Sequence, residues 1–263
     1  MQNESILRLS VFLGLFALFA ALETLAPRRR RQQPRSHRWR TNLSLVVLDT
    51  LALRALAVAL PFLAVGAAID AGRMGWGLFN HLTMPIWAET LLAILFLDFA
   101  IWVQHLISHK VPLFWRFHRV HHADRDFDVT TALRFHPVEI LASMLFKIGL
   151  VYLLGPPAVA VVLFEVILNG TAMFNHANLR LPLWLDRLLR LALVTPDMHR
   201  VHHSINRHEH DSNYGFALSV WDRIFRTYRP MPAAGHETMV VGLEWQDDKP
   251  SQLGWTLMLP FRK

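Results

Sequence analysis

Residues 86–109 read IWAETLLAILFLDFAIWVQHLISH, an apolar segment that ends in two histidines. Its apolar part, Ile86–Ile107, is long enough to cross a membrane, because a helix rises about 1.5 Å per residue and the hydrocarbon core is about 30 Å thick. His105 and His109 are four residues apart, so both imidazoles project from one helix face and can share a metal ion. The segment predicts a membrane helix with metal ligands at its end.

Three other apolar regions predict that this helix belongs to a bundle. They are Ile6–Ala26, Leu43–Ile69 with Asp49, Arg54 and Pro61 inside it, and Ile140–Phe174. Ile6–Ala26 lacks a basic leader and a small-residue cleavage site, so we expect a retained membrane helix and not a signal peptide. We expect Gly155-Pro156-Pro157 to break the last region into a hairpin of two short helices, because proline removes a backbone donor and disfavours helix before it. A single long tilted helix is the alternative, and it puts His176 on the face opposite His105.

Composition agrees with a membrane protein and excludes several other classes. Hydrophobic residues make up 53% of the 263 residues, which favours a membrane protein. The 27 Lys and Arg exceed the 20 Asp and Glu, but they flank apolar segments, so we expect no nucleic-acid binding. There is no cysteine, which excludes disulfides, thiolate zinc sites and a built-in iron–sulfur cluster. Any electrons that the protein uses must come from a partner.

Charge predicts the orientation. The connection after the first span carries seven arginines and no acidic residue, at positions Arg28, Arg29, Arg30, Arg31, Arg35, Arg38 and Arg40, whereas the next connection carries only Arg73. Basic connections stay in the cytoplasm, so this end of the bundle is expected to face it. The chain from His176 onward is polar and turn-rich, which predicts a water-facing cap with amphipathic helix such as Leu181–Leu193 at the interface. The apolar tail Trp255–Phe261 is expected to rest on the membrane.

Histidine spacing is the strongest functional signal. His118-Arg119-Val120-His121-His122 and His199-Arg200-Val201-His202-His203 repeat one pattern, HxxHH, which on a helix places two or three imidazoles on a common side. With His105 and His109 these boxes supply eight imidazoles, more than one metal ion needs and enough for two. Imidazole suits zinc, copper, iron and nickel. There is no HExxH and no pair of ExxH motifs, so a nitrogen-rich, oxygen-activating dimetal site is favoured over a hydrolase.

HxxxH, HxxHH and HxxHH in this order resemble the three histidine boxes of the fatty acid hydroxylase and sterol desaturase superfamily, which includes alkylglycerol monooxygenase. Further matching stretches are Arg134-Phe135-His136-Pro137-Val138-Glu139, Asn175-His176-Ala177-Asn178, Asp211-Ser212-Asn213-Tyr214-Gly215 and Leu218-Ser219-Val220-Trp221-Asp222-Arg223. The resemblance covers roughly residues 91–228. It implies an all-α integral membrane protein, a bundle of four to five transmembrane or re-entrant helices under a cytosolic helical cap that carries the boxes. Residues 1–83 would be the N-terminal helices with the basic connection, and residues 84–263 the catalytic domain.

The resemblance also implies a site and its cofactors. The metal ligands would be His105, His109, His118, His121, His122, His176, His199, His202 and His203, with His136 either a further ligand or a hydrogen-bond donor behind the ligands. Asp98, Glu209, Asp211, Asn213 and Tyr214 would lie behind them or shape the cap. His37, His81, His208, His210 and His236 fall outside the boxes and are expected to be ordinary surface or interfacial residues. Two iron ions would use dioxygen as cosubstrate, and zinc can replace iron in purified material.

The implied reaction is hydroxylation or desaturation of a lipid C–H bond, for example in a fatty acyl chain or sterol. We expect no haem domain fused to either end, so the electrons would come from a separate ferredoxin or a cytochrome with an NAD(P)H reductase. An ether-lipid monooxygenase is the alternative within enzymes. A histidine-rich metal transporter or metal-binding membrane protein is the alternative from another class, although transport sites lie near the bilayer midplane and these histidines gather at helix ends and in polar segments.

Overall fold

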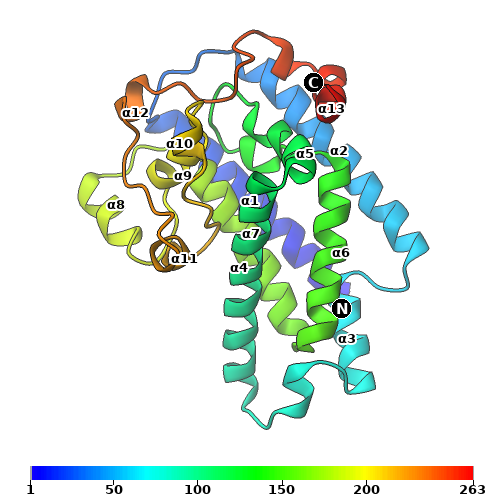
Figure 1. The fold of residues 1–263 in the computed structure, drawn as a ribbon. Helices are drawn as coiled ribbons and strands as arrows, with labels where there is room; N and C mark the ends of the chain where they lie inside the picture. Colours follow the sequence, from blue (N-terminus) through cyan, green and yellow to red (C-terminus); the bar gives the residue numbers. More distant parts are fainter. Residues whose placement is uncertain (1, 263) are drawn as a thin grey trace.

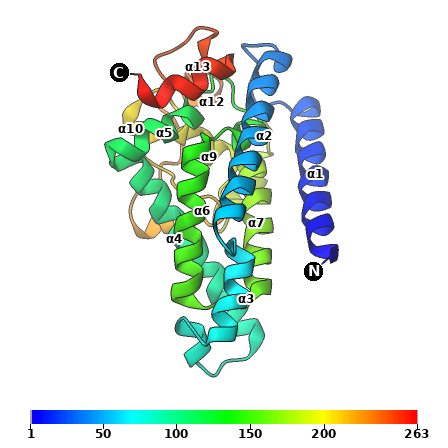
Figure 2. The same cartoon turned by 90° about the vertical axis from the view of Figure 1, so that its right-hand side faces the viewer.

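The computed structural model describes the backbone of residues 2–262 and the side chains of residues 6–262. Long helices run side by side in a bundle, and shorter helices form a cap at one end of it (Figures 1 and 2). The bundle comprises α1 (Gln2–Leu25), α2 (Arg35–Ala59), α3 (Ala64–Met74), α4 (Ile86–Lys110), α6 (Pro137–Leu154) and α7 (Ala158–His176). The cap comprises α5 (Pro112–His122), α8 (Leu183–Leu189), α9 (Pro196–His202), α10 (Arg207–His210), α11 (Val220–Ile224), α12 (Gly235–Thr238) and α13 (Leu253–Met258).

The all-helical class is confirmed. Within residues 2–262 the β-structure is limited to three isolated bridges. Five segments are long and apolar enough to cross a membrane: Ile6–Leu25, Arg35–His81, Ile86–Lys110, Pro137–Leu154 and Ala158–His176. The second segment is not one helix, because the chain leaves the helix at Leu60, directly before Pro61, and resumes at Ala64.

The predicted hairpin of two helices is present at Gly155-Pro156-Pro157. Gly155 ends α6 in a left-handed conformation with φ of 62°, which costs glycine little. A β-carbon on Gly155 would lie 2.3 Å from the carbonyl oxygen of Trp76, so the turn packs directly against the connection before α4. The chain therefore reverses, and α7 returns to the end of the bundle where α4 ends (Figure 1). His176 and His105 lie at the same end, and the single long helix is excluded.

Two tryptophan–carboxylate hydrogen bonds join the cap to the side of α4. Trp102 Nε1 on α4 donates to Asp222 of α11 at 3.0 Å, and Trp221 Nε1 on α11 donates to Asp98 of α4 at 2.7 Å. Asp222 also accepts from the backbone N–H groups of Tyr214 at 2.8 Å and Gly215 at 2.9 Å. The carboxylate of Asp222 thereby fixes the segment that passes beside the histidines.

The basic connection packs onto the cap through a buried ion-pair cluster. Both Nε and Nη2 of Arg38 donate to the two oxygens of Asp124 at 2.7 Å, and Nη1 donates to Asp128 at 2.6 Å. Asp124 follows the second histidine box by two residues. Burial raises the pKa of its carboxyl, but the charge and hydrogen bonds of Arg38, with Arg134 and Asn42, outweigh burial and lower the pKa to about 2. Asn42 donates a further hydrogen bond to Asp124 at 3.1 Å. This arginine therefore fixes the chain that leaves α5 and does not simply flank a membrane helix.

Two apolar surface segments were predicted to lie at the membrane. α8 leaves Leu183, Trp184, Leu188 and the following Leu191 exposed, as an interfacial helix would. The C-terminal tail differs from a segment that only rests on a membrane. Trp255 and Leu259 are buried with Leu45 of α2 and Val120 of α5, while Met258 and Phe261 stay exposed.

Replacing Arg38 with Met is expected to destabilise the protein by about 3–5 kcal/mol, because Asp124 and Asp128 would be left buried without their cation. The measurement is the thermal unfolding midpoint in detergent micelles, with Arg40→Met as the matched control on an exposed neighbouring arginine. Equal midpoints for the two variants would contradict this role of Arg38.

Candidate metal centre

Four elements bring the predicted ligands together at the capped end of the bundle. The last two turns of α4 carry His105 and His109, α5 carries the second box, α7 ends in His176, and α9 with the following residue carries the third box. All nine side chains are at most 4% exposed. Histidine is usually intermediate in burial, so nine almost fully buried imidazoles in one place are unusual.

The imidazoles form two groups, in each of which one nitrogen per ring lies within 4.8 Å of all the others. The first group contains five histidines and the second four: His105, His109, His118, His122 and His202, then His121, His176, His199 and His203. Each HxxHH box is divided between the groups. In each box, the two histidines that are four residues apart share a helix face and belong to the same group. The third histidine of the box belongs to the other group. Each HxxHH box therefore supplies histidines to both groups.

The donor atoms fit two metal ions. Nε2 of His105 lies 3.1 Å from Nε2 of His118, and Nε2 of His176 lies 3.1 Å from Nε2 of both His121 and His199. Among the described residues, buried Nε2 of His122 and His202 has no hydrogen-bond partner. Buried polar atoms are normally satisfied, and converging imidazole nitrogens are the donors that iron or zinc takes.

Groups behind the ligands fix the rings. Nδ1 lies 2.7 Å from a backbone carbonyl oxygen in three rings, with the pairs His105–Tyr214, His176–Ala172 and His202–Ser212. In the fourth ring, Nδ1 of His118 lies 2.7 Å from a carboxylate oxygen of Glu139. Each acceptor holds the proton on Nδ1 and leaves Nε2 free to bind a metal. The role of Glu139 was missed in the sequence, although it belongs to the matched stretch after His136.

The residues expected behind the ligands have mixed outcomes. The carbonyl oxygen of Tyr214 contacts Nδ1 of His105, and Asp211 lies 3.5 Å from Nδ1 of His109. Glu209 instead accepts from Ser204 Oγ at 2.6 Å and Ala233 N at 2.6 Å. Asn213, at a positive φ of 52°, bonds the backbone of Met198 and Arg229 and thus shapes the cap. Asp98 was expected to orient a ligating imidazole, but its carboxylate accepts from Trp221.

The remaining histidines also differ from the expectation in part. His136 joins neither group. Its Nδ1 caps α6 by accepting from Val138 N at 3.1 Å, and its Nε2 lies 3.2 Å from the carbonyl oxygen of Leu257. His37, His81 and His208 are exposed as expected. His210 and His236 are buried instead, at 7% and 3% exposure, and His210 lies beside His109 and Asp211.

Electrostatics favour the neutral form of five histidines from the two HxxHH boxes. Burial lowers the pKa of His121, His122, His199, His202 and His203 well below the ordinary value of histidine, and the neighbouring imidazoles lower it further. Only a neutral imidazole has a lone pair for a metal. These five imidazoles are therefore in the neutral form that can bind a metal ion.

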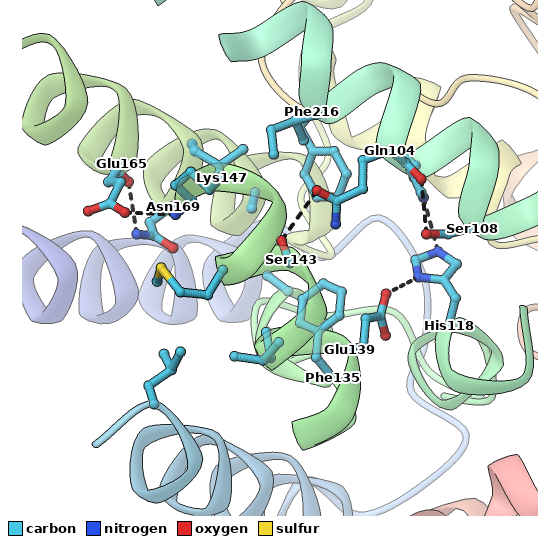
Figure 3. A pocket seen from close by; sticks show the side chains of 18 of the residues that line it. Gln104, Ser108, His118, Phe135, Glu139, Ser143, Lys147, Glu165, Asn169 and Phe216 are labelled. Carbon is cyan, nitrogen blue, oxygen red and sulfur yellow. Dashed lines mark hydrogen bonds and ion pairs between the residues drawn. The ribbon is translucent and has the colours of Figure 1, made fainter. Parts of the chain in front are cut away.

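Two cavities reach the first group from opposite directions. One of about 310 Å³ lies inside the bundle and is lined by His105, His118 and Glu139 (Figure 3). The other, of about 420 Å³, lies in the cap and is lined by His109, His210 and Asp211. The arrangement can therefore admit one reactant from the bundle and others from the side of the cap.

Comparison with known proteins agrees with the sequence motifs. The model of the fatty acid hydroxylase family matches residues 90–227, just over half of the chain. Human alkylglycerol monooxygenase is 34% identical over 57% of this chain and 32% of its own length. The ornithine lipid hydroxylase OlsE of Rhizobium tropici is 27% identical over 84% of this chain and 67% of its own. Human cholesterol 25-hydroxylase is 26% identical over 53% of this chain and 50% of its own.

No solved structure gives a significant match. The match with the human monooxygenase spans about a third of that enzyme's length. The chain belongs to the fatty acid hydroxylase family.

Replacing Glu139 with Ala is expected to lower metal affinity by about 10–100-fold, because His118 loses the acceptor that orients its ring. Glu139→Gln keeps a carbonyl acceptor and is expected to lose less. Affinity is measured by competition with a chelator, with exposed Glu244→Ala as the control. Unchanged metal retention in Glu139→Ala would rule out this positioning role.

The metal-free fold is expected to lose stability as the pH falls below about 6.5, the ordinary pKa of histidine. Below this pH the histidines of the unfolded chain bind protons, whereas the buried imidazoles of the folded chain do not. The free energy of unfolding therefore decreases as the pH is lowered. The measurement is the unfolding midpoint in micelles as the pH is lowered from neutral. His203→Leu should flatten the dependence and exposed His208→Ala should not; a midpoint independent of pH would contradict the argument.

Proposed function

We propose that this member of the fatty acid hydroxylase family is a membrane-bound, non-haem di-iron oxygenase that hydroxylates a C–H bond of a lipid. The observation that carries the proposal is the division of nine buried imidazoles into a group of five and a group of four. Two irons held by these groups would supply activation of dioxygen and removal of hydrogen from an unactivated carbon. The overall reaction consumes one dioxygen, two electrons and two protons and converts the C–H bond to an alcohol, with release of one water.

The residues of the chain contribute positioning and exclusion of water. Glu139 and the carbonyl oxygens of Ala172, Ser212 and Tyr214 hold the imidazoles in the tautomer that binds metal. The cavity inside the bundle presents Ile101, Phe135, Ala132 and Phe216 beside the histidines. These apolar side chains exclude water from the reacting carbon. The substrate would reach this cavity from the bilayer.

The activities for which the relatives are named support a lipid substrate. The relatives are a monooxygenase of alkylglycerols, a hydroxylase of an ornithine lipid and a hydroxylase of cholesterol. A second candidate is ether-lipid cleavage, favoured by the 34% identity with the human alkylglycerol enzyme. Hydroxylation of the carbon beside an ether oxygen gives a hemiacetal, which releases an aldehyde. Product analysis separates these reactions, since hydroxylation gives an alcohol, ether cleavage an aldehyde and desaturation an alkene.

We also propose that the capped end of the bundle faces the cytoplasm. The arginine-rich connection lies at this end, and basic connections stay on the cytoplasmic side. A soluble donor, a ferredoxin or a cytochrome with its reductase, would deliver electrons there. Residues 84–263, with a core at 91–228, would be the catalytic region, although Arg38 from the preceding part helps to hold its second histidine box.

Protein purified anaerobically with iron is expected to hold two irons per chain and to take up dioxygen when given a reductant and a membrane-lipid extract. His121→Ala should lose both iron and lipid-dependent uptake, whereas His208→Ala, an exposed histidine outside both groups, should keep both. Metal analysis, an oxygen electrode and mass spectrometry of the lipids provide the measurement. A single zinc with no uptake from a competent electron donor would overturn the di-iron proposal and favour metal transport or storage.

A further inference from the structure

Two hollows lie on opposite sides of one thin wall between α4 and α6. The interior cavity of about 310 Å³ and an outer groove of about 510 Å³ share four lining residues: Gln104, Ser108, Glu139 and Ser143. A weak contact joins α4 and α6 in this wall, because the hydrogen bond from Ser143 Oγ to Gln104 Oε1 is long, at 3.4 Å (Figure 3). The groove is thus separated only by these side chains from the cavity that His105 and His118 line.

The outer groove is apolar and open. Leu113, Phe114, Val138, Leu145 and Phe146 line it and are between 38% and 61% exposed. It is bordered by α4 and α6, both of which are long and apolar enough to cross a membrane. A groove of this chemistry on the lipid-facing side of two such helices fits a hydrocarbon chain.

The interior cavity is different, because its far end is charged. Lys147 Nζ lies 2.7 Å from a carboxylate oxygen of Glu165, which is also bound by Arg8, and Asn169 lies one turn from Glu165 on α7 (Figure 3). An ammonium has three N–H donors and the ion pair with Glu165 uses one. Charged groups inside a membrane bundle are costly and usually mark a functional site.

The charged end and the metal centre are joined by one face of α6. Glu139, Ser143 and Lys147 are spaced four residues apart, so they form a row that extends about 12 Å along the helix. Glu139 holds a ligand at one end of the row, and Lys147 offers donors at the other. A molecule in this cavity meets this row of polar groups together with apolar side chains such as Phe135 and Phe216, whereas the groove has polar groups only where it borders the cavity.

We propose that the substrate is an amphipathic lipid with a compact, oxygen-bearing head group, which enters between α4 and α6 with its head inside the bundle. This inference rests on the proposed function and specifies its substrate. The head accepts hydrogen bonds from Lys147 and Gln104, and the hydrocarbon chain stays in the outer groove. The carbons next to the head then cross the wall beside His105 and His118. Oxidation falls on the part of the lipid near the head group and not at the end of the chain.

The orientation is tested by photo-crosslinking to zinc-loaded protein in lipid nanodiscs, which requires no turnover. Two hexadecylglycerol ethers are compared, with a diazirine either on the chain carbon nearest the glycerol or at the chain end. The first is expected to label Gln104 and Ser143, and the second Leu113, Phe114 or Leu145. Excess hexadecan-1-ol should suppress the labelling and hexadecane should not. The reverse pattern, or labelling confined to other helices, overturns the proposal.

The head-group site is tested by dissociation constants for the unlabelled ether on the same zinc-loaded protein. Lys147→Met is expected to weaken binding by about tenfold or more, and Lys147→Arg to restore it. Tyr152→Phe is the matched control, because it removes a hydrogen bond of 2.8 Å from α6 to Asp70 outside the cavity. If Lys147→Met lowers the unfolding midpoint but binds the ether as the parent does, the ion pair only holds the helices together and the proposal is wrong.

These experiments distinguish failure of the proposed head-group site from failure of the proposed oxygenase function. If binding and labelling are as expected but the iron-loaded protein takes up no dioxygen, the lipid site is supported and the oxygenase proposal is wrong. Lipid-dependent uptake together with unchanged binding in Lys147→Met would leave the oxygenase intact and remove this head-group site.

Discussion

The structure depends on burying nine imidazoles and directing them at one another. A buried nitrogen without a partner costs about 1–3 kcal/mol, and here several meet in one place. In His122 and His203, burial and the neighbouring imidazoles both disfavour protonation, so these rings do not relieve the cost by taking up charge. Shared cations are the partners that suit converging lone pairs. The surrounding helices have to hold the rings in position against these unfavourable interactions.

The surrounding contacts act at the points where the ligand-bearing segments would otherwise move. Arg38 fixes the chain that leaves the second box, through Asp124. Asp222 fixes the backbone of Tyr214, whose carbonyl oxygen orients His105. Both contacts come from outside the histidine boxes, and both are buried charged or charge-assisted hydrogen bonds, which are stronger than neutral ones. Ligand geometry in this chain is thus set largely by residues that touch no metal position.

Much of this architecture is predictable from sequence, for clear reasons. Membrane helices follow from length and hydropathy, the α6–α7 hairpin follows from Gly155-Pro156-Pro157, and eight of the ten predicted ligands follow from spacing. His176 was included by resemblance and joins the group of four. His136 was included by resemblance, but it lies before Pro137, where it caps a helix instead. Glu139, His210 and Asp222 were missed because their roles depend on contacts between segments far apart in the chain. The carbonyl oxygens behind the rings carry no residue signature, so no sequence pattern could identify them.

The two groups of imidazoles are not equivalent in their surroundings. The group of five borders both cavities, through His105 and His118 on the bundle side and through His109 on the cap side. The group of four lines neither of these cavities, and Phe127 and Phe135 stack against its His176 and His121. Under the proposed function, a lipid from the bundle and small reactants from the cap therefore meet at the first position. The second position is shielded, which suits a role in supporting the first rather than in contacting the lipid.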